Sequence, residues 1–209
     1  MLVEVSENGV CDNSEIKKSI SVTLVANTRK TAVRIVTVPH LPKNGKLSQA
    51  EQWKLVKEHF PYGEKFNENT HVFDGSIFTN NNGQPRFFMT ALPVSVCDEF
   101  TKAGIKLVGS IHRITRLETI EHILFREYIS KSEPDESLFI FIPQDDGLRV
   151  LYIADCLPNA AHFISNHPDY REDEFLRFYN ALEKPEKQRV IFHKDNGNFE
   201  WLNDLLKLK

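Results

Sequence analysis

Residues 138–142 read Leu-Phe-Ile-Phe-Ile, an unbroken apolar run typical of a central strand that is buried on both faces. Residues 143–147 contain Pro, two Asp and Gly, which favour a turn. The chain then resumes a strand-like pattern over residues 148–153. We expect the two runs to pair antiparallel, and this pair anchors the prediction of the fold.

The segments that follow extend the same unit. Residues 156–165 are predicted to add a third strand to the meander. A helix is expected from about residue 172 to 182, because Phe175 and Tyr179 recur at helical spacing. A strand at 189–193 and a last amphipathic helix complete the order strand, strand, strand, helix, strand, helix.

The N-terminal part also alternates strands and helices. Residues 20–25 and 33–38 alternate β-branched and polar side chains and predict a hairpin. Residues 48–51, Ser-Gln-Ala-Glu, form a capping box that predicts a helix start. Residues 72–78 and 86–92 read as an antiparallel pair joined by an Asn- and Gly-containing turn.

Further along, Ser95 is expected to cap a short helix that ends at Gly104. A strand is predicted at residues 105–111, and a second capping box at residues 115–118 predicts the next helix. The element order of the first part thus resembles that of the second, with one strand inserted. We expect two domains: a first half with an inserted small subdomain in residues 1–130, and a shortened second half in residues 131–209.

Composition limits the class of protein. With 209 residues, 41% hydrophobic and 11% aromatic, the chain can bury a sizeable core. The net charge is −3 and the basic residues are scattered, which predicts no nucleic-acid partner. The three cysteines lie far apart in sequence, which favours a reducing compartment. No apolar run approaches about 18 residues, and the start lacks the features of a signal peptide, so we expect a cytoplasmic protein without direct membrane insertion.

Three short stretches carry a resemblance to a known superfamily. Residues 90–95 read Thr-Ala-Leu-Pro-Val-Ser, residues 100–108 contain Ala-Gly-Ile-Lys, and a strand at residues 34–39 ends in Pro. This pattern resembles the actin-like proteins of pilus assembly and type II secretion, in which a strand ending in Ala-x-Pro leads into a helix and then Ala-Gly-Leu/Ile-Lys. The element order likewise resembles a duplicated ribonuclease-H-like fold. The expected class is therefore α/β, with two ribonuclease-H-like halves, actin-like, and degenerate or truncated at the C-terminus.

The resemblance also implies where a nucleotide would bind. Active members hold phosphate with an Asp-x-Gly-x-x-x-Thr hairpin in each half. Here Asp145, Asp146 and Gly147 keep an Asp-x-Gly outline without the threonine, and the first half has no such sequence. These residues are candidates for a degenerate phosphate loop, but the same sequence also forms an ordinary tight turn. We predict no bound cofactor.

Two other sets of residues contain side chains that can bind a metal ion. One set of possible metal ligands is three carboxylates, Asp74, Glu118 and Asp155. A second set is His162 and His167 with Asp169. Turn, helix-face and surface-loop roles explain both sets, so we predict no metal site and no catalytic residue. Cys97 falls in a first helical turn, which lowers a thiol pKa, although its apolar neighbours favour an inert core residue.

The function expected from the resemblance is a non-catalytic scaffold or adaptor in a bacterial envelope-assembly system of the pilus or type II secretion kind. One alternative is an enzyme of the same fold that binds a nucleotide or phosphorylated ligand. Another is an interaction domain of an unidentified family. The partner is expected to be a protein or the chain itself. Trp201 and Leu208 fall off the main apolar stripe of the last helix, so they form either an interface or a wide core face.

Overall fold

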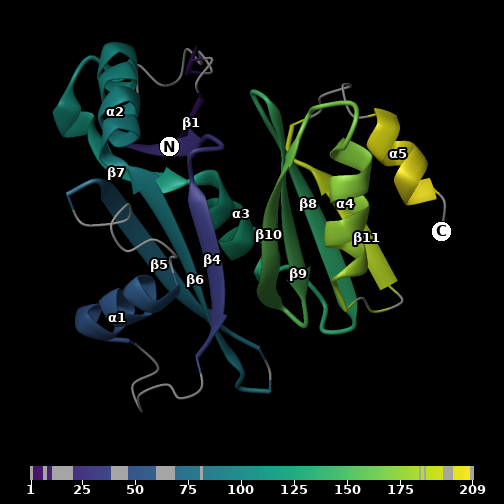
Figure 1. Cartoon of the computed structure of the whole chain (residues 1–209). Coiled ribbons are helices and arrows are strands. Elements are labelled where there is room, and N and C mark those ends of the chain that lie inside the picture. Colours follow the sequence, from purple (N-terminus) through teal and green to yellow (C-terminus); the bar gives the residue numbers. More distant parts are fainter. Residues whose placement is uncertain are drawn as a thin grey trace.

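The computed structural model describes residues 2–6, 9–10, 21–38, 47–59, 69–80, 82–183, 185, 187–194 and 200–207. Three sheets organise these residues (Figure 1). The N-terminal sheet has the strand order β2-β1-β3-β7 and comprises β1 (Leu2–Ser6), β2 (Gly9–Val10), β3 (Val22–Asn27) and β7 (Ile114–Thr119). Strands β1, β3 and β7 are parallel, and β2 is antiparallel to β1.

The inserted sheet is antiparallel and has the order β4-β6-β5, with β4 (Ala32–Thr37), β5 (His71–Thr79) and β6 (Pro85–Pro93). The C-terminal sheet has the order β10-β9-β8-β11, with β8 (Glu136–Gln144), β9 (Gly147–Ala154), β10 (Leu157–Ser165) and β11 (Lys187–Phe192). Strands β8, β9 and β10 form an antiparallel meander, and β11 is parallel to β8.

In the described part of the chain, five α-helices pack around the sheets: α1 (Gln49–His59), α2 (Val94–Val108), α3 (Ile120–Ile129), α4 (Arg171–Asn180) and α5 (Glu200–Lys207). A 3-10 turn, η2, spans Ile111–Arg113. Figure 1 shows α3 between the C-terminal sheet and the other two sheets, with α4 and α5 on the far face of the C-terminal sheet. Within the described part, every strand before residue 130 belongs to the first two sheets and every strand after it to the third.

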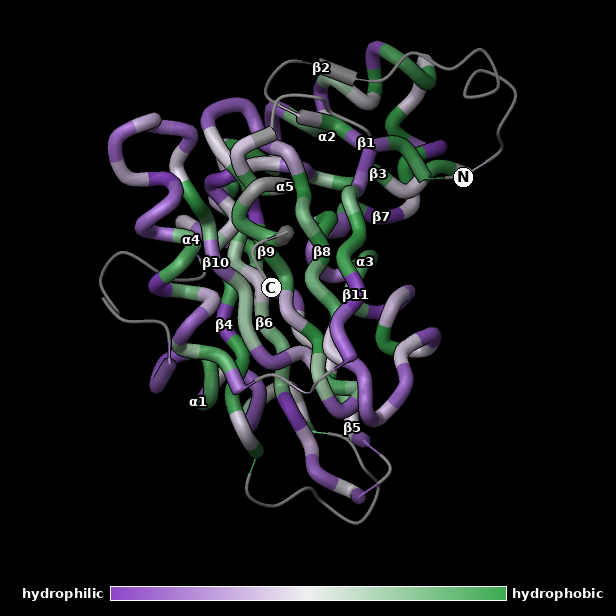
Figure 2. The backbone as a smooth tube through the Cα atoms, turned by 90° about the vertical axis from the view of Figure 1, so that its right-hand side faces the viewer, coloured by the Kyte–Doolittle hydropathy of each residue, from purple (hydrophilic) through white to green (hydrophobic). Residues whose placement is uncertain are grey.

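Strand β8 is the centre of the core, as predicted, because both of its faces are covered. Leu138, Ile140 and Ile142 pack toward α3, and Phe139 and Phe141 pack toward α4. All five side chains are fully buried. Figure 2 shows the hydrophobic residues concentrated along β8 and β9 in the middle of the molecule. The predicted antiparallel pair and its third strand are confirmed.

The predicted hairpin of residues 20–38 is wrong. Strand β3 lies between β1 and β7, whereas β4 pairs with β6 in the inserted sheet. The side-chain pattern identified two strands correctly but carried no information about their partners. The helix that begins after Ser48 and the β5–β6 pair are confirmed, with Ser48 and Glu51 hydrogen-bonded reciprocally as a capping box.

Two further expectations around α2 are wrong. Gly104 does not end the helix but lies inside it, against Leu24 of β3, so the predicted strand at 105–111 is mainly helical. The helix ends at Gly109, whose φ of 78° is the left-handed conformation that favours glycine. The second predicted capping box is strand β7 instead, and Thr119 caps α3 by accepting a hydrogen bond from the backbone N–H of His122.

Candidate functional site

The turn of Asp145 and Asp146 joins β8 to β9 in a tight hairpin. Asp146 forms an ion pair with Arg29, which follows β3 of the N-terminal sheet. A Cβ atom at Gly147 would overlap the carbonyl oxygen of Ile164 on β10. Glycine is therefore required here by the close approach of two strands, and a phosphate ligand is not needed to explain it. The turn lies where the two halves meet.

Beside this turn, Glu4 of β1 joins the N-terminal sheet to the end of β11. Its carboxylate accepts hydrogen bonds from His193 Nε2 at 3.0 Å, Lys194 Nζ at 2.8 Å and Asn27 Nδ2 at 2.9 Å. Burial alone would raise the pKa of Glu4, but these hydrogen bonds and the charge of Lys194 lower it to about 2. Lys194 adopts a left-handed φ of 66°, a backbone strain that accompanies this contact.

Amide side chains extend the contact between the halves. Gln144, at the end of β8, donates a hydrogen bond to Asn27 Oδ1 at 3.1 Å. Asn27 in turn donates to the carbonyl oxygen of Pro143 at 3.2 Å. The ends of β3 and β8 are thus tied directly to each other by side chains of the chain itself.

A buried ion pair lies deeper between the halves. Arg149 of β9 places Nε 3.3 Å from Glu121 Oε1 on α3 and donates from a terminal nitrogen to the carbonyl of Thr31 at 2.9 Å. Glu121 is completely buried, and its pair with Nε lacks the alignment of a hydrogen bond. Burial raises the pKa of Glu121 and lowers the pKa of Arg149, and each partner's charge opposes the other's shift.

We refer to these groups together as the polar junction. Its members are Glu4, Asn27, Arg29, Glu121, Gln144, Asp146, Arg149, His193 and Lys194. Chemically, the polar junction holds the two halves together with groups that are mostly engaged by one another.

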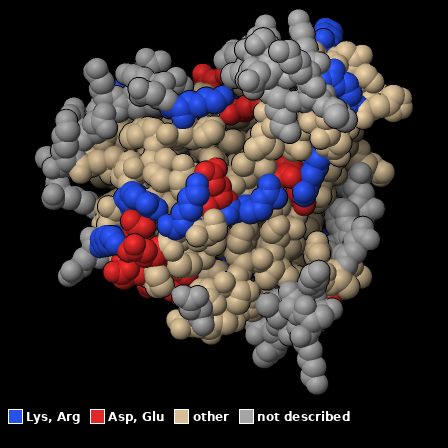
Figure 3. All heavy atoms as spheres, turned by 180° about the vertical axis from the view of Figure 1, so that it is seen from behind, with Lys and Arg blue, Asp and Glu red and all other residues tan. Residues whose placement is uncertain are grey.

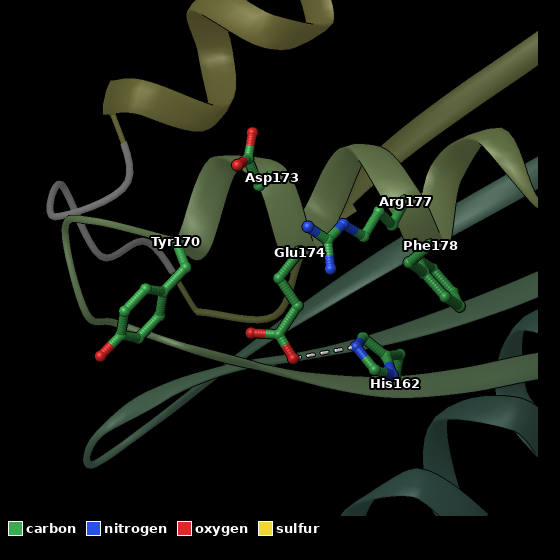
Figure 4. Close-up of a pocket in the computed structure, with 6 residues that line it drawn as sticks. All are labelled: His162, Tyr170, Asp173, Glu174, Arg177 and Phe178. Carbon is green, nitrogen blue, oxygen red and sulfur yellow. Dashed lines mark hydrogen bonds and ion pairs between the residues drawn. The ribbon is translucent and has the colours of Figure 1, made fainter.

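A surface cavity of about 560 Å³ lies between α4 and the edge strand β10, and we call it the α4–β10 groove (Figure 4). It is lined by His162, Tyr170, Asp173, Glu174, Arg177 and Phe178. Except for His162, these residues recur along one face of α4 and the turn that precedes it. The opposite face of α4, with Phe175 and Tyr179, packs on the C-terminal sheet.

The floor of the groove is held in place by Glu174. Figure 4 shows its side chain extending from α4 to His162, with Oε1 3.2 Å from His162 Nε2. Its other oxygen accepts the backbone N–H of Ser165 at 3.2 Å. The His162 ring stacks on Phe178 with centroids 5.2 Å apart and planes 12° apart. This floor is therefore preformed.

The rim of the groove is exposed and charged. Asp173 and Arg177 are both exposed, and neither has an ion-pair partner among the described residues. Tyr170 is 53% exposed and stacks on His167 with centroids 4.2 Å apart. A cavity of this size with aromatic walls and a few polar groups is typical of a binding site.

A third constellation lies where β5 meets α3. Ser76 Oγ is 2.6 Å from His122 Nε2, and His122 Nδ1 is 3.2 Å from Asp74 Oδ2. Burial alone would raise the pKa of Asp74, but His122 and Arg116 lower it overall. His122 is buried and its ring packs edge-on against Phe88. His122 is the buried member and the Asp74 side chain is 38% exposed, and together the three polar side chains connect α3 to the inserted sheet.

The structure gives the candidate metal ligands other partners. Arg116 bridges Asp74 at 3.6 Å and Glu118 at 2.8 Å, whereas Asp155 interacts with Asn80. The histidine set also divides, since His162 pairs with Glu174, while His167 lies 3.7 Å from Asp169. Among the residues that the structure describes, no group of His, Cys, Asp and Glu has the arrangement of a metal site.

Cys97 is half-buried in the first turn of α2. Burial, reinforced by the charge of Asp98, raises the pKa of its thiol to about 11. The thiolate is therefore disfavoured at neutral pH, which supports the role of an inert core residue over that of a nucleophile.

The two predicted interface residues are placed differently. Trp201 of α5 is only 9% exposed and packs edge-on against Phe175, with the Arg171 guanidinium 5.2 Å from its ring centroid. Trp201 therefore packs α5 against α4 in this structure. This placement corresponds to the wide core face, one of the two alternatives that the sequence offered. Leu208 lies outside the described residues.

Figure 3 shows basic and acidic side chains alternating across the back of the molecule. Among the ion pairs of the described residues, Glu118 lies between Arg116 at 2.8 Å and Arg126 at 2.9 Å. On the described part of this face, charges of one sign do not form a large patch. Separately, no helix among the described residues is long and apolar enough to cross a membrane.

Sequence reasoning missed the α4–β10 groove and most of the polar junction. The groove had a local signal: Tyr170, Asp173 and Arg177 recur on the helix face that is not needed for the core. The polar junction had none, because Glu4 and His193 are separated by 189 positions in sequence.

Comparisons with known proteins bear on the fold. No protein-family model matches the sequence, and no curated protein matches it. Among solved structures, the chain is similar to a Bacteroides thetaiotaomicron VPI-5482 protein of unknown function with an actin-like ATPase fold, at a TM-score of 0.54 and 10% identity. That match covers 90% of this chain but only 65% of the other. The chain is also similar to the PilM–PilN type IV pilus biogenesis complex, at a TM-score of 0.60 and 12% identity, over 97% of this chain and 75% of that one. The chain therefore has the actin-like ATPase fold.

Proposed function

We propose that this chain is a non-catalytic, cytoplasmic actin-like adaptor that binds a partner protein in a bacterial envelope-assembly machine of the pilus or type II secretion kind. The likeness to the pilus biogenesis complex carries this proposal, because nearly the whole chain superimposes on a protein that assembles with another. In this proposal the two halves divide near residue 130.

The polar junction supports the non-catalytic part of the proposal. The only Asp-x-Gly turn that sequence reasoning offered as a phosphate loop has the Asp146 carboxylate paired with Arg29, and a packing reason for its glycine. The neighbouring side chains of Glu4, Asn27 and Gln144 bond to one another across the halves. A phosphate there would approach two carboxylates, which electrostatic repulsion disfavours.

The test is deletion of the gene in its own organism, followed by complementation. We expect loss of pilus assembly or secretion, restored equally by the wild type and by Asp146→Asn, because an adaptor does not require that carboxylate for chemistry. Normal assembly in the deletion strain would refute the proposal. Calorimetric titration of the purified chain with Mg-ATP should show no binding, and a dissociation constant in the low micromolar range would favour a nucleotide-binding enzyme instead.

A further inference from the structure

We propose that the α4–β10 groove is the docking site for an extended segment of the partner protein that carries a Lys or Arg beside an apolar side chain. This inference rests on the proposed adaptor function and assigns its surface.

One face of α4 is fixed, and the opposite side is available. Phe175 and Tyr179 are buried against the C-terminal sheet, and Trp201 packs beside them from α5. On the groove side, Glu174 is anchored at both oxygens by His162 and Ser165. A ligand would therefore meet a surface whose backbone and floor are already ordered, so binding costs little conformational entropy.

The apolar part of the site is the half-buried Phe178 ring with the stacked His162 ring. Tyr170, at 53% exposure, provides a second aromatic surface at the other end of the cavity (Figure 4). Exposed tyrosines beside a preformed pocket are favoured as interface anchors. A branched apolar side chain of the partner fits over the Phe178–His162 pair.

The charges of the groove favour a basic segment of the partner protein. Glu174 is hydrogen-bonded to His162 at the floor, and the Arg171 guanidinium lies against the Trp201 ring rather than in the groove lining. Among the residues that line the groove, the two carboxylates Asp173 and Glu174 outnumber the cation Arg177, and the largely exposed Asp169 adds a negative charge nearby in sequence. A Lys or Arg of the partner would gain from Asp173 and from the Tyr170 ring face. An acidic segment would be repelled.

The test uses the full chain and a random dodecapeptide phage library. Selection should enrich peptides that pair Lys or Arg with an apolar residue, and the best of these, made synthetically, is the probe for the variants. Asp173→Lys should weaken its binding about tenfold or more, whereas Glu172→Lys, the same charge change on the neighbouring residue outside the cavity, should change it less than about threefold. Arg177→Gln should tighten binding, because it removes the cation of the described groove lining, which opposes a basic ligand.

Three results would overturn the assignment: no enrichment, enrichment of acidic peptides, or equal weakening by Asp173→Lys and Glu172→Lys, which would indicate a general charge effect. If the peptide test fails but the deletion strain loses assembly, the adaptor function stands and its binding surface lies elsewhere on the chain. A deletion strain that assembles normally rejects the adaptor function whatever the peptide data show. The two outcomes are therefore distinguishable.

Discussion

At the polar junction, charged side chains from the two halves are paired with one another. In the α4–β10 groove, by contrast, Asp173 and Arg177 are exposed without ion-pair partners among the described residues. The two regions also differ in depth: Glu121 and Arg149 are buried at 0% and 6% exposure. Removing a charge should therefore cost stability at the polar junction and affect mainly recognition in the groove.

Under the proposed adaptor function, this difference assigns separate roles to the two regions. The surface between the halves is used here for cohesion, with Glu4, Asn27 and Gln144 linking β1, β3 and β8. A surface whose polar groups already hydrogen-bond to one another gains little binding free energy from a ligand. A preformed groove whose rim carries charges without ion-pair partners gains more binding free energy.

The largest effect is expected from Arg149→Ala. The substitution leaves the buried Glu121 carboxylate without its countercharge, which costs about 4 kcal/mol of the free energy of unfolding. Urea denaturation measures the loss. Should this variant fail to fold, the double variant Glu121→Leu with Arg149→Met provides the control, because replacing both charges with apolar groups should recover most of the stability. A single variant as stable as the wild type would show that the pair is not buried in solution.

Trp201→Ala should have the next largest effect, about 3 kcal/mol, because it removes a ring that is 91% buried between α5 and α4. The same denaturation assay measures it, and Leu176→Ala on the exposed side of α4 is the matched control, expected below about 1 kcal/mol. If Trp201 is instead an interface residue, the variant will unfold like the wild type at low concentration, and sedimentation will show weaker self-association.

The C-terminal half was largely predictable from sequence, and particular residues explain why. The run at 138–142 is apolar on both faces, which only a covered central strand tolerates, and Phe175 with Tyr179 marks the buried face of α4. These are local patterns. Parallel pairing of β3 with β1 and β7 joins segments far apart in the chain, so alternation in residues 20–38 could not reveal it.

The sites were less predictable for a related reason. Asp146 reads as a turn residue, and its ion pair with Arg29 spans 117 positions. His162 joins Glu174 only because β10 ends beside α4. The chemical role of a polar residue depends on its neighbours in space, and the tertiary fold determines those neighbours.

Glu4→Gln should have an intermediate effect with a specific pH dependence. The folded-state pKa of Glu4 is lowered from 4.5 to about 2, so the stability it contributes is present above pH 4.5 and is lost as the pH falls toward 2. We expect the wild type to exceed the variant by about 2 kcal/mol at pH 7, with the difference vanishing near pH 2. Denaturation at several pH values measures it. Glu127→Gln, which breaks an exposed pair with Lys131, is the control and should show little difference at any pH. A constant difference from pH 7 to 2 would contradict the assigned pKa.

The smallest effect on stability is expected in the groove, from Asp173→Asn. Asp173 is exposed in the first turn of α4, where a carboxylate interacts favourably with the helix dipole, so its loss should cost about 0.5 kcal/mol or less. Arg177→Gln should be similarly mild, because no described acidic side chain lies within ion-pair distance of the guanidinium. Thermal and urea denaturation of both variants provide the measurement. A loss above about 1.5 kcal/mol for either variant would place the groove with the polar junction as a structural charge cluster, because only an engaged or buried charge costs that much to remove. Wild-type stability together with altered peptide binding would show that these charges act in recognition.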